Sequence, residues 1–278
     1  MLDLVGFESL KVAMEGDGRV VVVEFDHGKA NEMGSAQLAE IERLTAYLVA
    51  SGAVVLISLS RRRTAKGTPI FIAGANVAER TGWAPAAVIA HVEWQRRVLA
   101  ALRRAPVFHV AVVDGVALGW GTEYLLTCDW RIAADSAEFG LPETGLGILP
   151  GAGGTSDLWS QIGVSQALRL GMTGERIRAD EALRIGLVQE RVADVDAGLA
   201  RARALAAMVA KKSPTAVAAF KAAVLESAGA AACADVEAQA YRHCVETGEA
   251  AIGRASFEVI RQGEPVAWGT RFLWKPET

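Results

Sequence analysis

Cysteine is scarce in this chain of 278 residues, which has three. Their spacing forms no disulfide framework, so we expect reduced thiols, as in cytosolic proteins. Cys233 and Cys244 fall on one expected helix, and His243 stands beside Cys244. Two adjacent side chains point in different directions and no second ligand pair is present, so the sequence predicts no metal site.

The chain also lacks a strong net charge and any long apolar run. Its formal charge is −3 and its pI about 5.9, which gives no sign of a nucleic-acid-binding surface. The longest apolar stretches are far shorter than the roughly 20 residues of a membrane-spanning helix. The first residues contain no basic segment leading into an apolar one. We therefore expect a soluble, cytoplasmic protein that binds neither nucleic acid nor a membrane.

Hydrophobic residues make up 51% of the chain, enough for a substantial core. Two β-prone runs, residues 7–13 and 19–25, flank a Glu-Gly-Asp-Gly turn and predict a hairpin. Ser35 is placed to cap a helix. The alternation then continues with an apolar strand at residues 53–58, a helix from Pro85 to about residue 104, and a strand at 107–113.

Helical patterns dominate after Gly163, with one short strand at residues 187–192. The order of elements predicts an α/β core followed by an α-helical C-terminal portion. The expected helices cover residues 164–171, 179–185, 196–211, 214–227, 231–246 and 249–262.

Two glutamates stand in the Gly-rich section between residues 113 and 155. Glu123 follows the turn Gly119-Trp120-Gly121, and Glu143 follows a second turn. Carboxylates among small and apolar residues are costly to desolvate and tend to have shifted pKa values suited to acid/base work. Glu is seldom buried, however, so the residues alone also allow two surface or capping side chains.

Two further features allow two interpretations each. The loop containing Arg61, Arg62, Arg63 and Lys66 is either a solvated turn or a patch for an anionic ligand such as a phosphate. His109, in an apolar strand, is more typical of a hydrogen-bonded core histidine than of a catalytic one.

Four separated stretches, FIAGAN, GVALGWGTE, FGLPETGLGILPGAGGT and GKAN, resemble the crotonase superfamily, also called the enoyl-CoA hydratase/isomerase family. The resemblance extends from about residue 7 to 265. It implies an α/β fold in which repeated ββα units form a spiral over residues 1–195. Residues 196–278 would form a helical region that covers the pocket and mediates assembly into a homotrimer or a dimer of trimers.

The resemblance also implies an acyl-CoA thioester substrate and no separate cofactor, because CoA is part of the substrate. Its enolate-like intermediate would be held in an oxyanion hole formed by the backbone N–H groups of Ala75 and Trp120. Trp120 lies at an expected helix N-terminus, where free N–H groups favour negative charge. One such donor contributes about 3 kcal/mol. The substrate-binding residues carried over are Lys29, Ala30, Ala73, Gly74, Ala75, Asn76, Val77 and Gly119.

Both glutamates match the hydratase pattern, with Glu123 activating water and Glu143 also holding it and protonating the α carbon. Addition of water to an activated double bond needs such a base and acid. The leading hypothesis is therefore a 2-enoyl-CoA hydratase. The alternatives are a Δ3,Δ2-enoyl-CoA isomerase, or another acyl-CoA-processing enzyme, that uses Glu143 alone, and a non-catalytic acyl-CoA-binding paralogue.

The sequence departs from the family pattern at three positions. Trp120 replaces the middle glycine of Gly-Gly-Gly, so its indole is expected to wall the acyl pocket or to shift the main chain. Asn76 replaces an aspartate, a nearly equivalent N-cap. Pro106 lies two residues earlier than usual before the central strand. In the context of CoA, the basic loop becomes a candidate for contact with phosphates.

Overall fold

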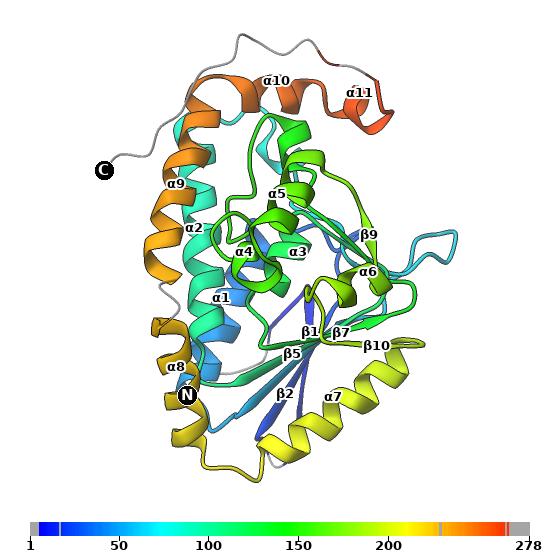
Figure 1. Ribbon diagram of the computed structural model, residues 1–278, viewed down its shortest axis with the longest axis vertical. Coiled ribbons are helices and arrows are strands. Elements are labelled where there is room, and N and C mark those ends of the chain that lie inside the picture. Colours follow the sequence, from blue (N-terminus) through cyan, green and yellow to red (C-terminus); the bar gives the residue numbers. More distant parts are fainter. Residues whose placement is uncertain (1–5, 17, 228–229, 265, 267–278) are drawn as a thin grey trace.

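Three successive segments of the chain each contribute one strand to each of two sheets (Figure 1). The computed structural model describes residues 6–16, 18–227, 230–264 and 266, with backbone only at 227, 230–236 and 249. In each segment the first strand joins a six-stranded sheet and the second a four-stranded sheet. The pairs are β3 (Val55–Ser60) with β4 (Ile70–Ile72), β5 (Phe108–Val113) with β6 (Val116–Leu118), and β7 (Trp130–Ala134) with β8 (Glu138–Gly140).

This repetition is the spiral that the resemblance implies, and the α/β fold class is confirmed. The larger sheet has the order β1-β2-β3-β5-β7-β10 and the smaller one β4-β6-β8-β9. The predicted hairpin is the antiparallel pair β1 (Leu10–Glu15) and β2 (Val20–Phe25). Of the predicted strand at 187–192, only β10 (Glu190–Val192) forms, parallel to β7, and β9 (Ile177–Arg178) closes the smaller sheet antiparallel to β8.

Helices cover both faces of the larger sheet. The main core lies between one face and α1 (Ser35–Ala50), α2 (Pro85–Arg104) and α3 (Trp120–Leu125). On the other face, α7 (Val195–Val209) buries Val195, Leu199 and Ala202 against the sheet, although the sequence grouped nearly all of it with the C-terminal helical region. The N-cap of α1 is Gly34 and not Ser35 as expected.

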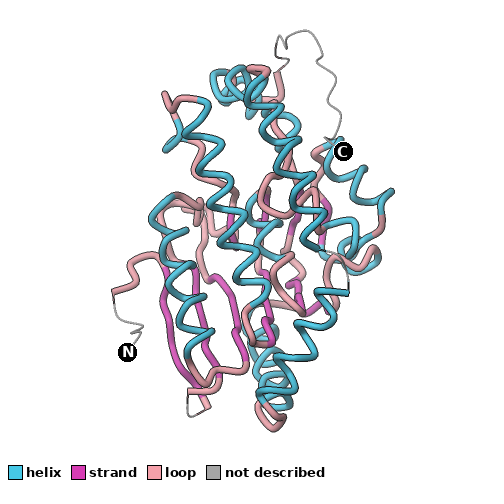
Figure 2. Tube along the Cα trace, turned by 90° about the vertical axis from the view of Figure 1, so that its left-hand side faces the viewer, coloured by secondary structure: helices cyan, strands magenta, loops and turns pink. Residues whose placement is uncertain are grey.

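The remaining helices pack beside this core. In Figure 1, α9 (Ala230–Glu246) runs along α2, and in Figure 2 this helical layer faces the viewer in front of the strands. The predicted final helix is divided at Ser256 into α10 (Glu249–Ala255) and α11 (Phe257–Arg261). The others are α4 (Leu158–Ile162), α5 (Val164–Thr173), α6 (Ala179–Arg184), α8 (Pro214–Ser227) and the 3-10 turns η1 (Ala78–Arg80) and η2 (Glu143–Leu146).

The register of the smaller sheet determines where the Gly-rich turns meet. Parallel β4 and β6 pair Ile70 with Val116 and Ile72 with Ala117. The carboxyl ends of parallel strands lie at the same sheet edge. The segment after β4, residues 73–77, therefore lies beside the segment after β6, residues 119–121.

Candidate active site

Two backbone N–H groups are left available at this edge. The N–H groups of Ala73 and Asn76 donate to the carbonyls of Ala30 and Met33 at 3.1 and 2.9 Å. These bonds hold the loop 73–76 against residues 30–33. Trp120 is the first residue of α3, where an N–H has no intrahelical acceptor. Within the described ranges of the chain, neither Ala75 nor Trp120 donates a hydrogen bond from its backbone N–H.

The turn before α3 lies against Glu143. Gly119 has a φ of +51°, a conformation that side chains disfavour. A Cβ atom at Gly119 would lie 2.6 Å from Oε1 of Glu143, and one at Gly74 would lie 3.5 Å from the carbonyl oxygen of Leu118. Only a glycine at position 119 lets the carboxyl of Glu143 approach the turn that presents the Trp120 N–H.

Glu143 is a buried carboxyl group with an unused oxygen. It begins η2, its side chain is 9% exposed, and its Oε2 atom has no hydrogen-bond partner among the described residues. Burial raises its pKa well above the ordinary value, and the nearby charge of Glu123 raises it further. Both effects favour the neutral, protonated form of Glu143, which is the form that an acid needs.

Glu123 is also buried, but the main chain stabilises its charge. Its Oε1 atom accepts hydrogen bonds from the N–H groups of Ala152 and Gly154 at 2.7 and 3.0 Å. Burial, followed by the charge of Glu237, raises its pKa to about 7, while the two N–H donors oppose this shift. The two glutamates thus differ, because Glu123 is partly ionised near neutral pH and suits the role of a base.

A third carboxylate, Glu237 on α9, completes the surroundings of Glu123. It is fully buried and accepts hydrogen bonds from the N–H groups of Gly153, Thr155 and Ser156 at 2.9, 2.8 and 3.0 Å. The N–H groups of residues 152–156 thus point toward Glu123 or Glu237. This loop therefore binds both Glu123 and Glu237. No short-range signal marks Glu237, because only the packing of α9 brings it here.

The indole of Trp120 is buried in the main core. Trp120 is 2% exposed, belongs to the main core and stacks on Tyr124 with ring centroids 5.8 Å apart. This packing gives no support to the expectation that the indole walls an acyl pocket. Its indole Nε1 is buried without a partner among the described residues.

Comparisons with known proteins identify the family of this chain. The sequence profile described as "Enoyl-CoA hydratase/isomerase" matches residues 18–262. The chain belongs to this family. Human "Enoyl-CoA hydratase domain-containing protein 2, mitochondrial" is 36% identical over 236 residues, which cover 83% of this chain and 80% of that protein.

Two further members are similar over different lengths. The "Short-chain-enoyl-CoA hydratase" of Clostridium acetobutylicum is 35% identical over 176 residues, 61% of this chain and 64% of that protein. The crystal structure of an enoyl-CoA hydratase from Bacillus anthracis superposes with a TM-score of 0.74 at 31% identity, covering 94% of this chain and 99% of that one. The crotonase-type fold and family are therefore established.

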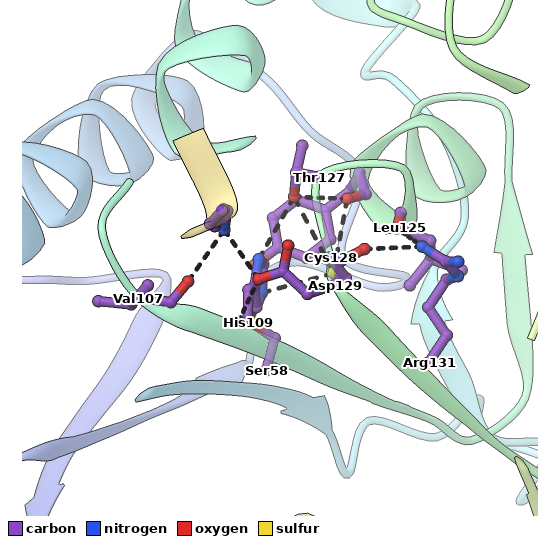
Figure 3. A network of polar contacts seen from close by, with 10 residues as sticks. Ser58, Val107, His109, Leu125, Thr127, Cys128, Asp129 and Arg131 are labelled. Carbon is purple, nitrogen blue, oxygen red and sulfur yellow. Dashed lines mark hydrogen bonds and ion pairs between the residues drawn. The ribbon is translucent and has the colours of Figure 1, made fainter. Parts of the chain in front are cut away.

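His109 is a core residue in this family member, as the sequence suggested. It is fully buried, and its Nε2 atom lies 2.8 Å from the hydroxyl of Ser58 and 3.5 Å from Sγ of Cys128 (Figure 3). Burial lowers the pKa of His109 to about 3 and raises that of Cys128 to about 12. The imidazole is neutral and the thiol protonated, so the pair is not an activated nucleophile.

The basic loop is mostly neutralised within the chain. Arg61 pairs with Asp196 at 2.7 Å, Arg62 with Asp26 at 2.8 Å and Arg63 with Asp114 at 3.3 Å. Lys66 is exposed and has no ion pair in the described ranges. Lys29, another expected CoA-binding residue, is also exposed. In the described part of the chain, Lys66 thus differs from the three arginines in having no ion pair, a difference that the sequence alone did not reveal.

Among the described residues, no group of three or more His, Cys, Asp or Glu side chains is arranged to hold a metal ion. Nor is any helix that they form long and apolar enough to cross a membrane.

Proposed function

We propose that this family member is an enoyl-CoA hydratase that adds water across the double bond of a 2-enoyl-CoA thioester. The observation that carries the proposal is the pair of buried carboxyls, Glu123 and Glu143, beside the available N–H groups of Ala75 and Trp120. Their pKa values are raised to different extents, which suits one base and one acid.

The reaction follows from this arrangement. The thioester oxygen accepts hydrogen bonds from Ala75 and Trp120, which stabilise the negative charge that develops on it. Ionised Glu123 takes a proton from water as the oxygen bonds to C3 of the acyl group. The electrons of the double bond move toward the thioester, and neutral Glu143 donates its proton to C2. Proton exchange between the two carboxyls and solvent then restores the starting state.

The binding site for CoA is proposed along the loops at the same edge. Residues 29–30 and 73–77 would contact the thioester and pantetheine portions, together with Gly119. Lys66 is proposed to meet the phosphates, because Arg61, Arg62 and Arg63 are paired with carboxylates.

Self-association is also part of the proposal. The outer face of α4 and α5 exposes Trp159 (41%), Val164 (59%), Leu168 (54%) and Met172 (72%). An apolar patch of this kind on a soluble protein is typical of an interface. It supports assembly into a trimer or a dimer of trimers.

The test compares Glu123→Gln and Glu143→Gln with the unaltered protein on crotonyl-CoA, followed by the loss of enoyl-thioester absorbance. Each change is expected to lower kcat about 100-fold or more, with an unchanged circular dichroism spectrum. Full activity in both variants would overturn the proposal.

The same variants separate the alternatives. An isomerase or another enzyme that uses Glu143 alone would be impaired by Glu143→Gln and not by Glu123→Gln. A binding-only paralogue would retain a CoA thioester without exchanging its α proton in deuterated water.

A further inference from the structure

Arg80 is a buried cation close to the candidate active site with most of its guanidinium unused. It ends η1, five residues after Ala75, and is 7% exposed. Its Nε and Nη2 atoms have no hydrogen-bond partner among the described residues. A buried guanidinium left in this state is costly, because burial of an unpaired charge opposes folding.

Arg80 lines a small cavity of about 30 Å³ with Val77, Leu146, Ile148, Tyr241, Ala250 and Arg254. Val77 is two residues from the proposed oxyanion donor Ala75, and Leu146 ends the turn that begins with Glu143. The cavity wall therefore includes residues that directly follow the segment carrying Ala75 and the segment carrying Glu143. Its position suits the acyl end of a bound thioester.

The charges around the cavity are predominantly positive. Arg254, on α10, is a second guanidinium in the wall and disfavours the charge of Arg80, whose pKa is lowered mainly by burial. The two acids nearest in sequence or space are occupied elsewhere. Glu79 accepts hydrogen bonds from the Ser35 N–H at 3.0 and 3.2 Å, and Glu123 binds the Gly-rich loop. No carboxylate lines the described wall of the cavity.

We infer that the acyl group of the substrate ends in a carboxylate, which Arg80 binds from within the cavity and Arg254 binds from its edge. A carboxylate in the cavity would pair with the charge of Arg80 and offer acceptor oxygens to its guanidinium. An alkyl end would leave the buried charge uncompensated. The small volume limits the terminal group of the acyl chain to about the size of a carboxylate. That the carboxylate belongs to a CoA thioester rests on the proposed function.

Binding of saturated CoA thioesters tests the inference without requiring turnover. Glutaryl-CoA and valeryl-CoA both carry five-carbon acyl groups, and they differ in a terminal carboxylate or methyl. By isothermal titration calorimetry, we expect glutaryl-CoA to bind at least tenfold more tightly. Arg80→Met should abolish this preference and Arg80→Lys should retain part of it. Arg97→Met, at an exposed position of α2, is the matched control and should leave the preference unchanged.

Equal binding of the two thioesters by the unaltered protein would overturn the inference, whether or not the variants fold. Survival of the full preference in Arg80→Met would overturn it as well. Hydration assays with the corresponding five-carbon 2-enoyl-CoA thioesters keep the two proposals separate. If neither is hydrated while glutaryl-CoA is still preferred, the hydratase proposal fails and the role of Arg80 stands. If 2-pentenoyl-CoA is hydrated and glutaryl-CoA is not preferred, the hydratase proposal stands and the role of Arg80 fails.

Discussion

The Nε atom of Arg96 lies 3.2 Å from a carboxylate oxygen of Glu237, with side chains 13% and 0% exposed. Arg96 also donates to the carbonyl of Gly151 at 2.7 Å. One buried ion pair thus joins α2, α9 and the loop that binds Glu123. The charge of Glu237 is the second-largest contribution, after burial, to the raised pKa of Glu123.

Removal of the Glu237 charge should therefore change the pH dependence of catalysis. In Glu237→Gln, the pKa of Glu123 should fall below about 7, because a neighbouring negative charge is gone. A base with a lower pKa stays ionised at lower pH, so the acid limb of the kcat/KM profile should move to lower pH. An unshifted limb would contradict this electrostatic coupling and leave Glu237 a role in loop packing alone.

Loss of Arg96 should mainly affect stability. Arg96→Met leaves Glu237 buried without its counterion, and removal of one partner of a buried pair costs about 3–5 kcal/mol. Urea unfolding monitored by tryptophan fluorescence would measure the loss. Arg97→Met, at an exposed neighbouring position, should change the free energy of unfolding by less than about 0.5 kcal/mol. Similar losses in both variants would show that the pair itself matters little.

Gly119→Ala should impair turnover more than folding. The added Cβ meets Oε1 of Glu143 at 2.6 Å in a backbone conformation with φ of +51°. We expect kcat to fall about 100-fold, comparable to the loss of one oxyanion donor, and stability to fall by about 1–3 kcal/mol. Gly145→Ala in η2 is the matched control, since its Cβ would meet nothing within 4 Å. Normal turnover in Gly119→Ala would place Glu143 outside the chemistry.

Stability should decline with rising pH because of the buried carboxyls. The pKa of Glu123 is raised from 4.5 to about 7 on folding, so the unfolded chain loses this proton first as the pH rises. The stabilising contribution is complete below about pH 4.5 and is lost by about pH 7, a change of about 3 kcal/mol. Glu123→Gln should therefore gain stability relative to the unaltered protein between pH 5 and pH 8. The free energies of unfolding of the two proteins can be measured by urea titration at each pH. A constant difference between them across this range would refute the predicted contribution of Glu123.

Lys66→Ala should raise KM for a CoA thioester with little change in kcat, and the effect should shrink at high salt. The same variant should be normal on an N-acetylcysteamine thioester, which lacks the phosphates. Arg61→Ala should have a smaller effect, because Asp196 already neutralises Arg61 at 2.7 Å. Equal losses on both thioesters for Lys66→Ala would exclude phosphate contact.

Local patterns in the sequence were sufficient for the core of the fold. Apolar runs and turn residues identified most strands of the larger sheet, namely β1, β2, β3, β5 and part of β10. They also identified the turn carrying Trp120, whereas the segment carrying Ala75 was found through the resemblance to the family. They also singled out Glu123 and Glu143, which the fold buries, Glu143 against the Gly119 turn and Glu123 against the Gly-rich loop. Whether these residues have the proposed roles stays a prediction.

Residues whose positions depend on packing between distant segments could not be identified from the sequence. Glu237 and Arg254 come from helices whose position against the sheets no local pattern specifies. No motif in the sequence marks Arg80, and only the burial of its guanidinium without hydrogen-bond partners for Nε and Nη2 in the described part of the chain distinguishes it. For Trp120, the residue type suggested a wall of the acyl pocket, but the side chain packs into the core instead.

The separation of the Gly-rich loop from Glu237 has a consequence for biosynthesis. Glu237 follows Ser156 by 81 residues, so the loop leaves the ribosome long before the carboxylate that binds three of its N–H groups. The two sheets, whose strands end at Val192, can pair during that interval. We expect the surroundings of Glu123 to be the last part of the site to form, after α9 docks, so a nascent chain would assemble its scaffold before it acquires a working base.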